Sequence, residues 1–275
     1  MDLYSIKGIK ELLRAHNTAP KDRLGQNFLL EKRVAVKMLG ATDVSLKDTV
    51  LEIGPGIGTL TKELAKSAGK VITVEKDPVM VDILKETVKD FPNIEIIQAD
   101  ILVLRQTKEF LSLSKFKVVA NLPYYITSPV IRMFLETKNK PKLMVFMVQK
   151  EVGQRICAKP PDMNLLAVSV QFFAEPKIVS FISKGAFWPR PKVDSAILKI
   201  VPKKELSPVD SSLFFYIVKA GFKQPRKQLV NNLMQGLKLK REEIETWLHK
   251  AGIQPTKRAE TLSLKDWVSL TKSLP

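Results

Sequence analysis

The feature that most constrains the fold of this chain is a regular alternation of short apolar segments with segments of helical periodicity. Five apolar segments have the length and composition of buried strands, at 50–53, 71–74, 94–97, 117–120 and 143–148. Between the first three of them, apolar side chains recur at helical spacing in residues 59–68 and 78–88. Alternation of this kind is typical of βαβ units. The sequence therefore predicts an α/β fold built on a mainly parallel sheet.

The carboxy-terminal part of the chain has a different pattern. Segments 177–182 and 195–200 resemble a strand pair that closes one edge of the sheet. From residue 209 onward the pattern is helical, with one helix opening at V-D-S-S and another in L-S-L-K-D-W-V-S-L. We therefore expect three parts: an amino-terminal arm at 1–19, an α/β domain at 20–203 and a small all-helical domain at 204–275.

The charge of the chain points to a polyanionic partner. It has 45 Lys and Arg against 28 Asp and Glu, a formal charge of +17. The stretch 203–275 is densest in positive charge, with fourteen basic and seven acidic side chains. A lysine-rich surface that serves only solubility and thermal stability is the alternative. Nucleic acid is the leading expectation.

Several classes of protein are excluded by composition. Cys157 is the single cysteine, so neither an internal disulfide framework nor a zinc site built on paired cysteines is possible, and we expect no metal. No apolar stretch reaches the roughly 18 residues of a membrane span. The amino terminus lacks the features of a signal peptide. We expect a cytoplasmic protein that binds no membrane.

Candidate ligand-binding residues follow three successive predicted strands. E-I-G-P-G-I-G places Gly54, Gly56 and Gly58 in a first turn where backbone could approach a ligand closely. Glu75 ends the next strand, where its carboxylate could accept hydrogen bonds from ribose hydroxyls, and Asp100 ends the third, placed to meet an adenine amine. Together they predict a nucleoside-binding crevice.

A nicotinamide-dependent oxidoreductase is one alternative for this crevice. Such an enzyme needs an acid or base near the nicotinamide, commonly a histidine or a tyrosine assisted by lysine. Both histidines, His16 and His249, lie outside the predicted sheet, and no tyrosine is followed by a lysine four residues later. The spacing G-x-G-x-G also departs from the dinucleotide pattern.

The segment N-L-P-Y, residues 121 to 124, suggests methylation of an exocyclic amine. The lone pair of that nitrogen is delocalised into the ring, so a catalyst must favour a pyramidal transition state. The side-chain oxygen of Asn121 and the carbonyl of Leu122 or Pro123 could accept hydrogen bonds from the amine. Tyr124 could stack on a base taken out of its helix. No general base is required.

Taken together, E-I-G-P-G-I-G-T-L-T, E-K-D at 75–77, A-D at 99–100 and N-L-P-Y-Y-I-T-S-P resemble the small-subunit (16S) ribosomal RNA adenine N(6),N(6)-dimethyltransferase family. The resemblance implies a Rossmann-like class I methyltransferase domain that uses S-adenosylmethionine. L-G-Q-N-F-L is similar to the family's cofactor-covering motif, which implies Asn27 and Leu29 as cofactor contacts beside Asn121. F-W-P-R-P-K-V-D-S is similar to its second loop beside the target base, which implies Phe187 as the opposite stacking face.

The resemblance continues into the basic tail. F-K-Q-P-R-K-Q-L-V-N-N-L and R-A-E-T-L-S are similar to the family's RNA-facing signatures, which implies that Lys223, Arg226, Lys227 and Arg258 contact RNA phosphates. The family acts on two adjacent adenosines near the 3′ end of the small-subunit rRNA, within an assembling 30S particle. We expect a monomer that binds this RNA or its precursor.

Three alternatives stay open on the residues alone. A large-subunit rRNA adenine dimethylase shares the N-x-P-Y arrangement, although P-R-K-Q-L-V-N-N-L favours the small-subunit branch. A DNA adenine methyltransferase uses a similar motif but needs a larger recognition domain. A non-catalytic assembly factor on the same fold would have no need of Glu75, Asp100 and Asn121.

Overall fold

A computed structural model describes residues 2–104, 113, 115–137, 139–205 and 207–274. The chain forms two compact units. The α/β unit contains Met1–Gly153 and Lys177–Pro202, and the helical unit contains Gln154–Pro176 and Lys203–Pro275. Within the described ranges, no helix is long and apolar enough to cross a membrane.

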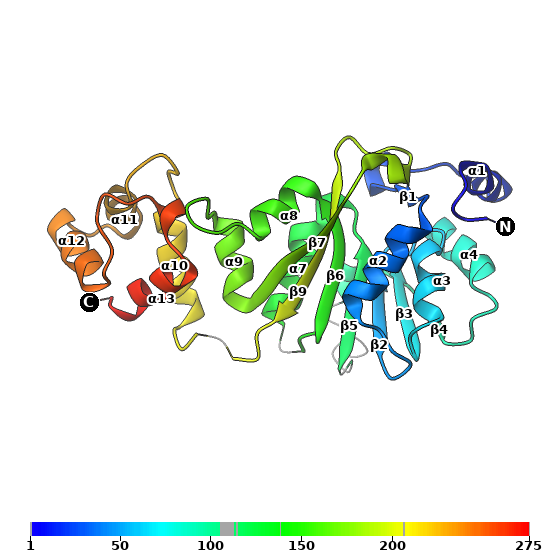
Figure 1. The fold of residues 1–275 in the computed structure, drawn as a ribbon, viewed down its shortest axis with the longest axis horizontal. Coiled ribbons are helices and arrows are strands. Elements are labelled where there is room, and N and C mark those ends of the chain that lie inside the picture. Colours follow the sequence, from blue (N-terminus) through cyan, green and yellow to red (C-terminus); the bar gives the residue numbers. More distant parts are fainter. Residues whose placement is uncertain (1, 105–112, 114, 138, 206, 275) are drawn as a thin grey trace. The chain divides into compact units, whose positions relative to one another are not determined.

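Seven of the described strands form one mixed sheet in the α/β unit, in the order β4-β3-β2-β5-β6-β9-β7 (Figure 1). They are β2 (Thr49–Ile53), β3 (Lys70–Glu75), β4 (Ile94–Gln98), β5 (Phe116–Asn121), β6 (Leu143–Gln149), β7 (Ala174–Ile182) and β9 (Ser195–Pro202). Neighbours from β4 to β6 are parallel, and β9 is antiparallel to β6. The predicted parallel sheet, with a strand pair at its edge, is confirmed.

The strand order creates a crevice at the carboxyl ends of the parallel strands. The chain runs from β2 outward to β3 and β4 and then returns to β5 on the other side of β2. Loops that leave β2 and β5 therefore diverge, which is the topological switch point where open α/β sheets bind ligands. Ile53, Glu75 and Asn121 are the last residues of β2, β3 and β5. Polar groups that are far apart in sequence thus lie near one another at the carboxyl ends of these strands.

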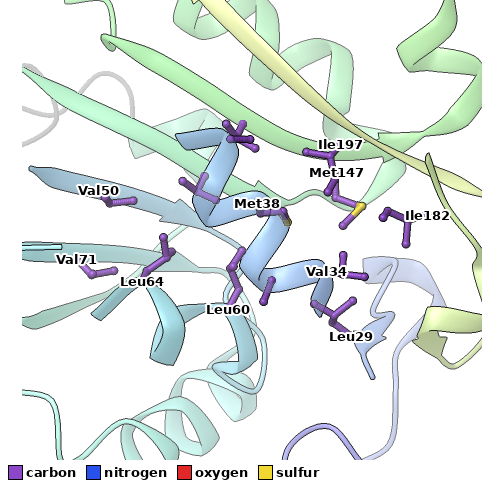
Figure 2. Packing of buried hydrophobic residues seen from close by; sticks show 14 of the residues in the cluster. Leu29, Val34, Met38, Val50, Leu60, Leu64, Val71, Met147, Ile182 and Ile197 are labelled. Atoms are coloured by element: carbon purple, nitrogen blue, oxygen red, sulfur yellow. The ribbon is translucent and has the colours of Figure 1, made fainter. Parts of the chain in front are cut away.

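Helices cover the sheet with apolar faces, and the periodicity of residues 59–68 and 78–88 predicts two of them, α3 and α4. They are α2 (Lys32–Thr42), α3 (Thr59–Ala65), α4 (Pro78–Thr87), α5 (Ile101–Leu104), α7 (Thr127–Glu136) and α8 (Lys150–Ile156), the last continuing into the helical unit. Figure 2 shows Val34 and Met38 of α2 in a buried cluster with Leu64 of α3 and Met147 of β6. Phe134 of α7 packs against Phe116 of β5, with ring centroids 6.3 Å apart.

The amino-terminal segment, predicted as an arm, packs into the α/β unit. Helix α1 (Ile6–Ala15) begins after Ser5, whose side chain accepts a hydrogen bond from the Gly8 N–H. Its apolar residues recur at helical spacing and are buried with side chains of β1, of the loop that follows β2 and of α4: Ile9, Leu12, Leu13, Phe28, Ile57, Met80 and Ile83. The arm is therefore part of the core around the crevice.

A short antiparallel ladder lies beside this core and was not predicted. It pairs β1 (Phe28–Leu29) with β8 (Phe187–Trp188), with Leu29 opposite Phe187 and Phe28 opposite Trp188. The rings of Phe28 and Trp188 are stacked, with centroids 6.4 Å apart and planes at 25°. The ladder joins the L-G-Q-N-F-L segment to the F-W-P-R-P-K-V-D-S segment, so two motifs about 160 residues apart in sequence form one wall.

The helical unit contains the helices expected after residue 209 and one more. They are α9 (Leu165–Phe173), α10 (Ser211–Gly221), α11 (Leu229–Leu237), α12 (Arg241–Lys250) and α13 (Leu264–Lys272). Asp210 caps α10 and Ser263 caps α13 in a capping box, as the sequence predicts. Gly221 is required where it stands, because a Cβ there would come within 2.4 Å of the Trp267 ring.

The boundary between the units differs from the predicted one at 203/204, since residues 154–176 also group with the helical unit. The reason is aromatic packing. Phe172 of α9 stacks on Phe214 of α10, with ring centroids 4.3 Å apart, and the Lys203 N–H donates to the Phe173 carbonyl at 2.9 Å. Chain order hides this grouping, because α9 precedes β7. That the units act as separate functional domains remains a prediction.

Candidate functional site

A cavity of about 200 Å³ opens at the carboxyl ends of the parallel strands in the α/β unit. Its walls come from the loop before β1, from the loops that follow β2, β3, β4 and β5, and from the β1–β8 ladder. The predicted site residues that line it are Asn27, Leu29, Gly54, Gly56, Glu75, Asp100, Asn121, Leu122, Pro123, Tyr124 and Phe187. Of the predicted residues in this unit, Gly58 is the exception.

The three glycines of the first turn have different roles. All have positive φ, at 65° for Gly54, 55° for Gly56 and 87° for Gly58, a region that side-chain-bearing residues rarely adopt. Gly54 and Gly56 face the cavity. A Cβ on Gly58 would instead meet the Thr87 hydroxyl at 2.8 Å and Leu84 at 2.9 Å. Gly58 therefore permits close packing of the loop on α4, and its contact with a ligand remains a prediction.

Glu75 is held at the cavity by backbone N–H groups. Its Oε1 accepts from the N–H groups of Lys76 at 2.8 Å and Asp77 at 2.9 Å, and its Oε2 accepts from the Gly56 N–H at 3.2 Å. Burial raises the pKa of this carboxyl, although the three N–H groups favour the charged form. A carboxylate has about four acceptor positions. One remains for a ligand hydroxyl, and a second hydroxyl would have to replace the longest bond, from Gly56.

Asp100 shares its place with a lysine. Its Oδ2 accepts from Lys76 Nζ at 2.9 Å, and its Oδ1 accepts from the Leu102 N–H at 2.9 Å. The hydrogen bond from Lys76 lowers the pKa of the Asp100 carboxyl against the opposing effect of burial. Asp100 is therefore ionised at neutral pH and can accept from an amine. The Lys76 side chain is largely exposed, so the ion pair can open at little cost.

Glu52 is a cavity residue that the sequence analysis did not single out. It lies within β2, is 1% exposed and lines the cavity, and its Oε2 has no hydrogen-bond partner within the described ranges. Burial raises its pKa to about 8, with the Thr61 hydroxyl opposing and the Glu75 carboxylate adding to the effect. The available signal was an acid in an otherwise apolar strand segment, V-L-E-I. A buried acceptor without a partner fits a ligand that carries a cationic group.

Asn121 and its loop form the opposite wall. The Asn121 side-chain nitrogen donates to the Asn27 carbonyl at 3.2 Å, which leaves the side-chain oxygen to accept from a ligand. The Pro123 carbonyl already accepts from the Ile126 N–H at 3.1 Å, in the turn η2 (Tyr124–Ile126). Leu122 is therefore the better candidate for the second acceptor.

The two predicted stacking residues differ in environment. Tyr124 is half-buried and its hydroxyl lies 2.9 Å from Ser195 Oγ. Burial raises the pKa of the phenol, and the Ser195 hydrogen bond opposes that effect. Phe187 is 3% exposed and packs in the same hydrophobic cluster as Leu29, although it also lines the cavity. Its ring is a less accessible stacking surface than that of Tyr124.

Asp77 holds the L-G-Q-N-F-L segment at the cavity, a role that the sequence did not predict. It accepts from Lys21 Nζ at 2.7 and 2.9 Å and from Gln26 Nε2 at 3.0 Å, and it also caps α4. Burial opposes its ionisation, but the hydrogen bonds from Lys21 and Gln26 outweigh it and lower the pKa of Asp77. Asn27 is thereby held next to Asn121.

The predicted RNA-facing residues lie on two loops of the helical unit that are joined by a backbone hydrogen bond. Lys223, Arg226 and Lys227 are exposed on the loop between α10 and α11, and Arg258 is exposed beside Glu260, at 3.7 Å. The Leu229 N–H donates to the Lys257 carbonyl at 2.7 Å, which joins the two basic segments. We call residues 223–228 and 256–258 together the basic loop pair.

Asn232, the second asparagine of the segment R-K-Q-L-V-N-N-L, has a structural role. Its side-chain nitrogen donates to the Gly221 carbonyl at 2.7 Å and to the Gln224 carbonyl at 3.0 Å, and the residue is fully buried. It closes the end of α10 and fixes the start of the loop. Asn232 therefore supports the basic loop pair and has no exposed surface with which to contact RNA.

Within the described ranges, no cluster of three or more His, Cys, Asp or Glu could hold a metal ion.

Comparisons with known proteins agree with this geometry. Residues 17–275 match the family model described as Ribosomal RNA adenine dimethylase. The chain is 47% identical to a Dehalococcoides mccartyi protein named Ribosomal RNA small subunit methyltransferase A, over 95% of this chain and 90% of the relative. It is 39% identical to the protein of the same name from Geobacillus thermodenitrificans, over 96% and 94%.

Two solved structures are similar to the described fold. One is the 23S rRNA methyltransferase ErmE, with a TM-score of 0.74 and 26% identity, covering 90% of this chain and 99% of that chain. The other is a dimethyladenosine transferase from Plasmodium falciparum, with a TM-score of 0.74 and 26% identity, covering 88% and 95%.

Proposed function

Because this chain belongs to the ribosomal RNA adenine dimethylase family, we propose that it dimethylates two adjacent adenosines near the 3′ end of 16S rRNA during assembly of the small ribosomal subunit. The chain is an S-adenosylmethionine-dependent rRNA adenine dimethyltransferase with a Rossmann-like class I fold. The resemblance stated from its motifs is confirmed. The observation that carries the proposal is Asn121, which ends β5 at the cavity within this family match.

The cavity fits the cofactor chemically. Glu75 and Asp100 offer acceptors for ribose hydroxyls and an adenine amine, and the Gly54 and Gly56 backbone leaves room for close approach. The unpartnered Glu52 oxygen suits the ammonium end of a cationic ligand. S-adenosylmethionine supplies an activated methyl group bound to a sulfonium. Asn27 and Leu29 would close the site from the amino-terminal side.

The target amine would lie against the Asn121 loop. The Asn121 side-chain oxygen and the Leu122 carbonyl would accept its two N–H groups, which draws the lone pair out of conjugation. Pro123 fixes the turn that carries them, and Tyr124 would stack on the base. After the first transfer only one N–H remains, so the second transfer needs space for a methyl group where a hydrogen bond had been.

The basic loop pair would grip the phosphate backbone. Exposed Lys223, Arg226, Lys227 and Arg258 supply salt-sensitive binding with little base specificity. Sequence selection would then come from the shape of the particle and from the pocket. Because its substrate is a ribosomal particle, we place the protein in the cytoplasm. We propose that it acts as a monomer.

A large-subunit substrate is the second candidate. It is favoured by the similarity to ErmE, whose name states 23S rRNA. The relatives named for the small subunit are closer in sequence, at 47% and 39% identity against 26%. The small-subunit substrate is therefore preferred.

The test is nucleoside mass spectrometry on small subunits that lack the modification, incubated with the protein and S-adenosylmethionine. Large subunits and duplex DNA serve as parallel substrates. We expect dimethyladenosine in the small-subunit RNA alone. Product in the large subunit would move the proposal to that substrate, and particle binding without any product would make the protein a non-catalytic assembly factor.

A further inference from the structure

We infer that Ser195 is a positioning residue that holds Tyr124 in place and thereby determines how completely the target amine is dimethylated. This inference rests on the proposed function, in which Tyr124 stacks on the target base. It assigns a reaction role to the last residue of the F-W-P-R-P-K-V-D-S segment, which lies outside the lining of the cavity.

The hydrogen bond between Tyr124 and Ser195 joins the turn η2 to the start of β9, beside the cavity. Ser195 is the first residue of β9, is fully buried, and lies opposite Gln149 at the end of β6. Its Oγ is 2.9 Å from the Tyr124 hydroxyl. Burial of Ser195 keeps water from competing for its hydroxyl. The Tyr124 ring is thus held at both ends, at its backbone by η2 and at its hydroxyl by Ser195.

The Ser195 end of this contact is itself fixed. The Lys150 N–H donates to the Asp194 carbonyl at 2.9 Å, and the Lys184 N–H donates to Asp194 Oδ1 at 3.0 Å. These bonds tie the start of β9 to the end of β6 and to the loop before β8. An anchor on rigid strands can restrict the rotation of an aromatic ring more than a loop residue could.

The restriction matters more for the second methyl transfer than for the first. An unmodified amine has two N–H groups for the Asn121 oxygen and the Leu122 carbonyl. A monomethyl amine has one, so its orientation depends more on stacking against Tyr124. Releasing the hydroxyl of Tyr124 should therefore slow the second transfer more than the first. Monomethyladenosine should accumulate.

The experiment compares Ser195→Ala, Tyr124→Phe and the double variant in single-turnover assays on unmodified small subunits, with both methylated nucleosides quantified over time. We expect each single variant to lower the ratio of the second rate to the first by about three- to tenfold, the effect of one neutral hydrogen bond. The double variant should be no worse than either single variant, because both remove the same bond.

Ser183→Ala is the matched control, since it deletes a hydroxyl that caps η3 (Lys184–Ala186), before β8, and that makes no hydrogen bond to Tyr124. It should leave the product ratio unchanged. Melting temperature and cofactor affinity are measured for every variant, so that a loss of folding is separated from a loss of positioning. Ser195→Cys preserves the size of the side chain with a weaker hydrogen bond and should give an intermediate ratio.

Tyr124→Ala distinguishes a failure of the proposed stacking role of Tyr124 from a failure of the positioning role of Ser195. If it leaves both transfers unchanged, the stacking role of Tyr124 in the proposed function is wrong. If Tyr124→Ala impairs transfer while Tyr124→Phe and Ser195→Ala keep the normal product ratio, only the positioning role of Ser195 is overturned. Additive effects in the double variant would also overturn it.

Discussion

The cavity of the α/β unit and the basic loop pair of the helical unit carry opposite charges in opposite environments. The cavity is lined by three acidic residues, Glu52, Glu75 and Asp100, against one lysine, Lys76, in a chain whose net charge is +17, and Glu52 keeps a proton at neutral pH until a cationic group binds beside it. The basic loop pair consists of exposed cations. Net charge thus reflects the exposed cations, including the proposed RNA-binding surface, and does not reveal the acidic lining of the cavity, the proposed cofactor site.

The difference predicts how each region responds to change. Cavity groups are buried or half-buried and most of them are fixed by hydrogen bonds within the protein, so a single substitution should have a large and specific effect that salt hardly alters. The exposed cations act through a shared field, so their effects should be graded and sensitive to salt. The following changes test this contrast, from the largest expected effect to the smallest.

Asn121→Ala should have the largest effect. It removes an acceptor that acts on the amine in the transition state, so we expect the rate of methyl transfer to fall by about 10²- to 10³-fold. Binding to the small subunit should be unchanged, because the basic loop pair is intact. Single-turnover rates and particle affinity are the two measurements. Unchanged turnover would remove Asn121 from the mechanism.

Glu75→Gln should weaken cofactor binding by roughly ten- to a hundredfold, the effect of losing a charged acceptor. Isothermal titration calorimetry with S-adenosylmethionine measures this directly. Asp82→Asn, on the exposed side of α4, is the matched loss of an acid and should leave affinity unchanged. An equal effect of both variants would mean that overall charge, not the ribose contact, determines affinity.

Reversing Arg226 and Lys227 to Glu should lower affinity for the particle by about tenfold at low salt. It should also reduce the slope of log affinity against log salt by about 1 for each lost phosphate contact. Lys47→Glu with Lys89→Glu, both exposed in the α/β unit, gives the same change in net charge. If this control weakens binding equally, the interface is not specific to the basic loop pair.

Glu52 should make stability depend on pH. Its folded pKa is raised from 4.5 to about 8, so the folded state keeps a proton that the unfolded state releases. The free energy of unfolding should therefore fall as pH rises between about 4.5 and 8, by up to about 1.4 kcal/mol per pH unit. Urea titrations across this range measure the slope. Glu52→Gln, which cannot ionise, should flatten it, and an unchanged slope would contradict the assignment.

Lys76→Met should have the smallest effect. It releases Asp100 from an exposed ion pair of little strength, so cofactor affinity should rise by no more than about fivefold, and less at high salt. Calorimetry at two salt concentrations is the measurement. A fall in affinity would show that Lys76 itself contacts the cofactor.

The glycines and the acids show where sequence reasoning succeeds and where it stops. Gly54 and Gly56 were predicted beside a ligand and do line the cavity, since a strand followed by a tight turn is visible in local sequence. Gly58 has the same local signature, but it packs on Leu84 and Thr87 of α4. Glu52 was not predicted, because a single acid in an apolar strand forms no repeating pattern that would mark it as a site residue.

The sequence by itself determined the parallel sheet, the family and the cavity residues at the strand ends, because periodicity and motif spacing are local properties of the chain. Only the tertiary structure decided the β1–β8 ladder, the transfer of α9 to the helical unit and the bond between Tyr124 and Ser195. Each of these joins segments that are distant in sequence. Their pairing depends on which surfaces remain to be buried once the sheet has formed, and no local pattern records that outcome.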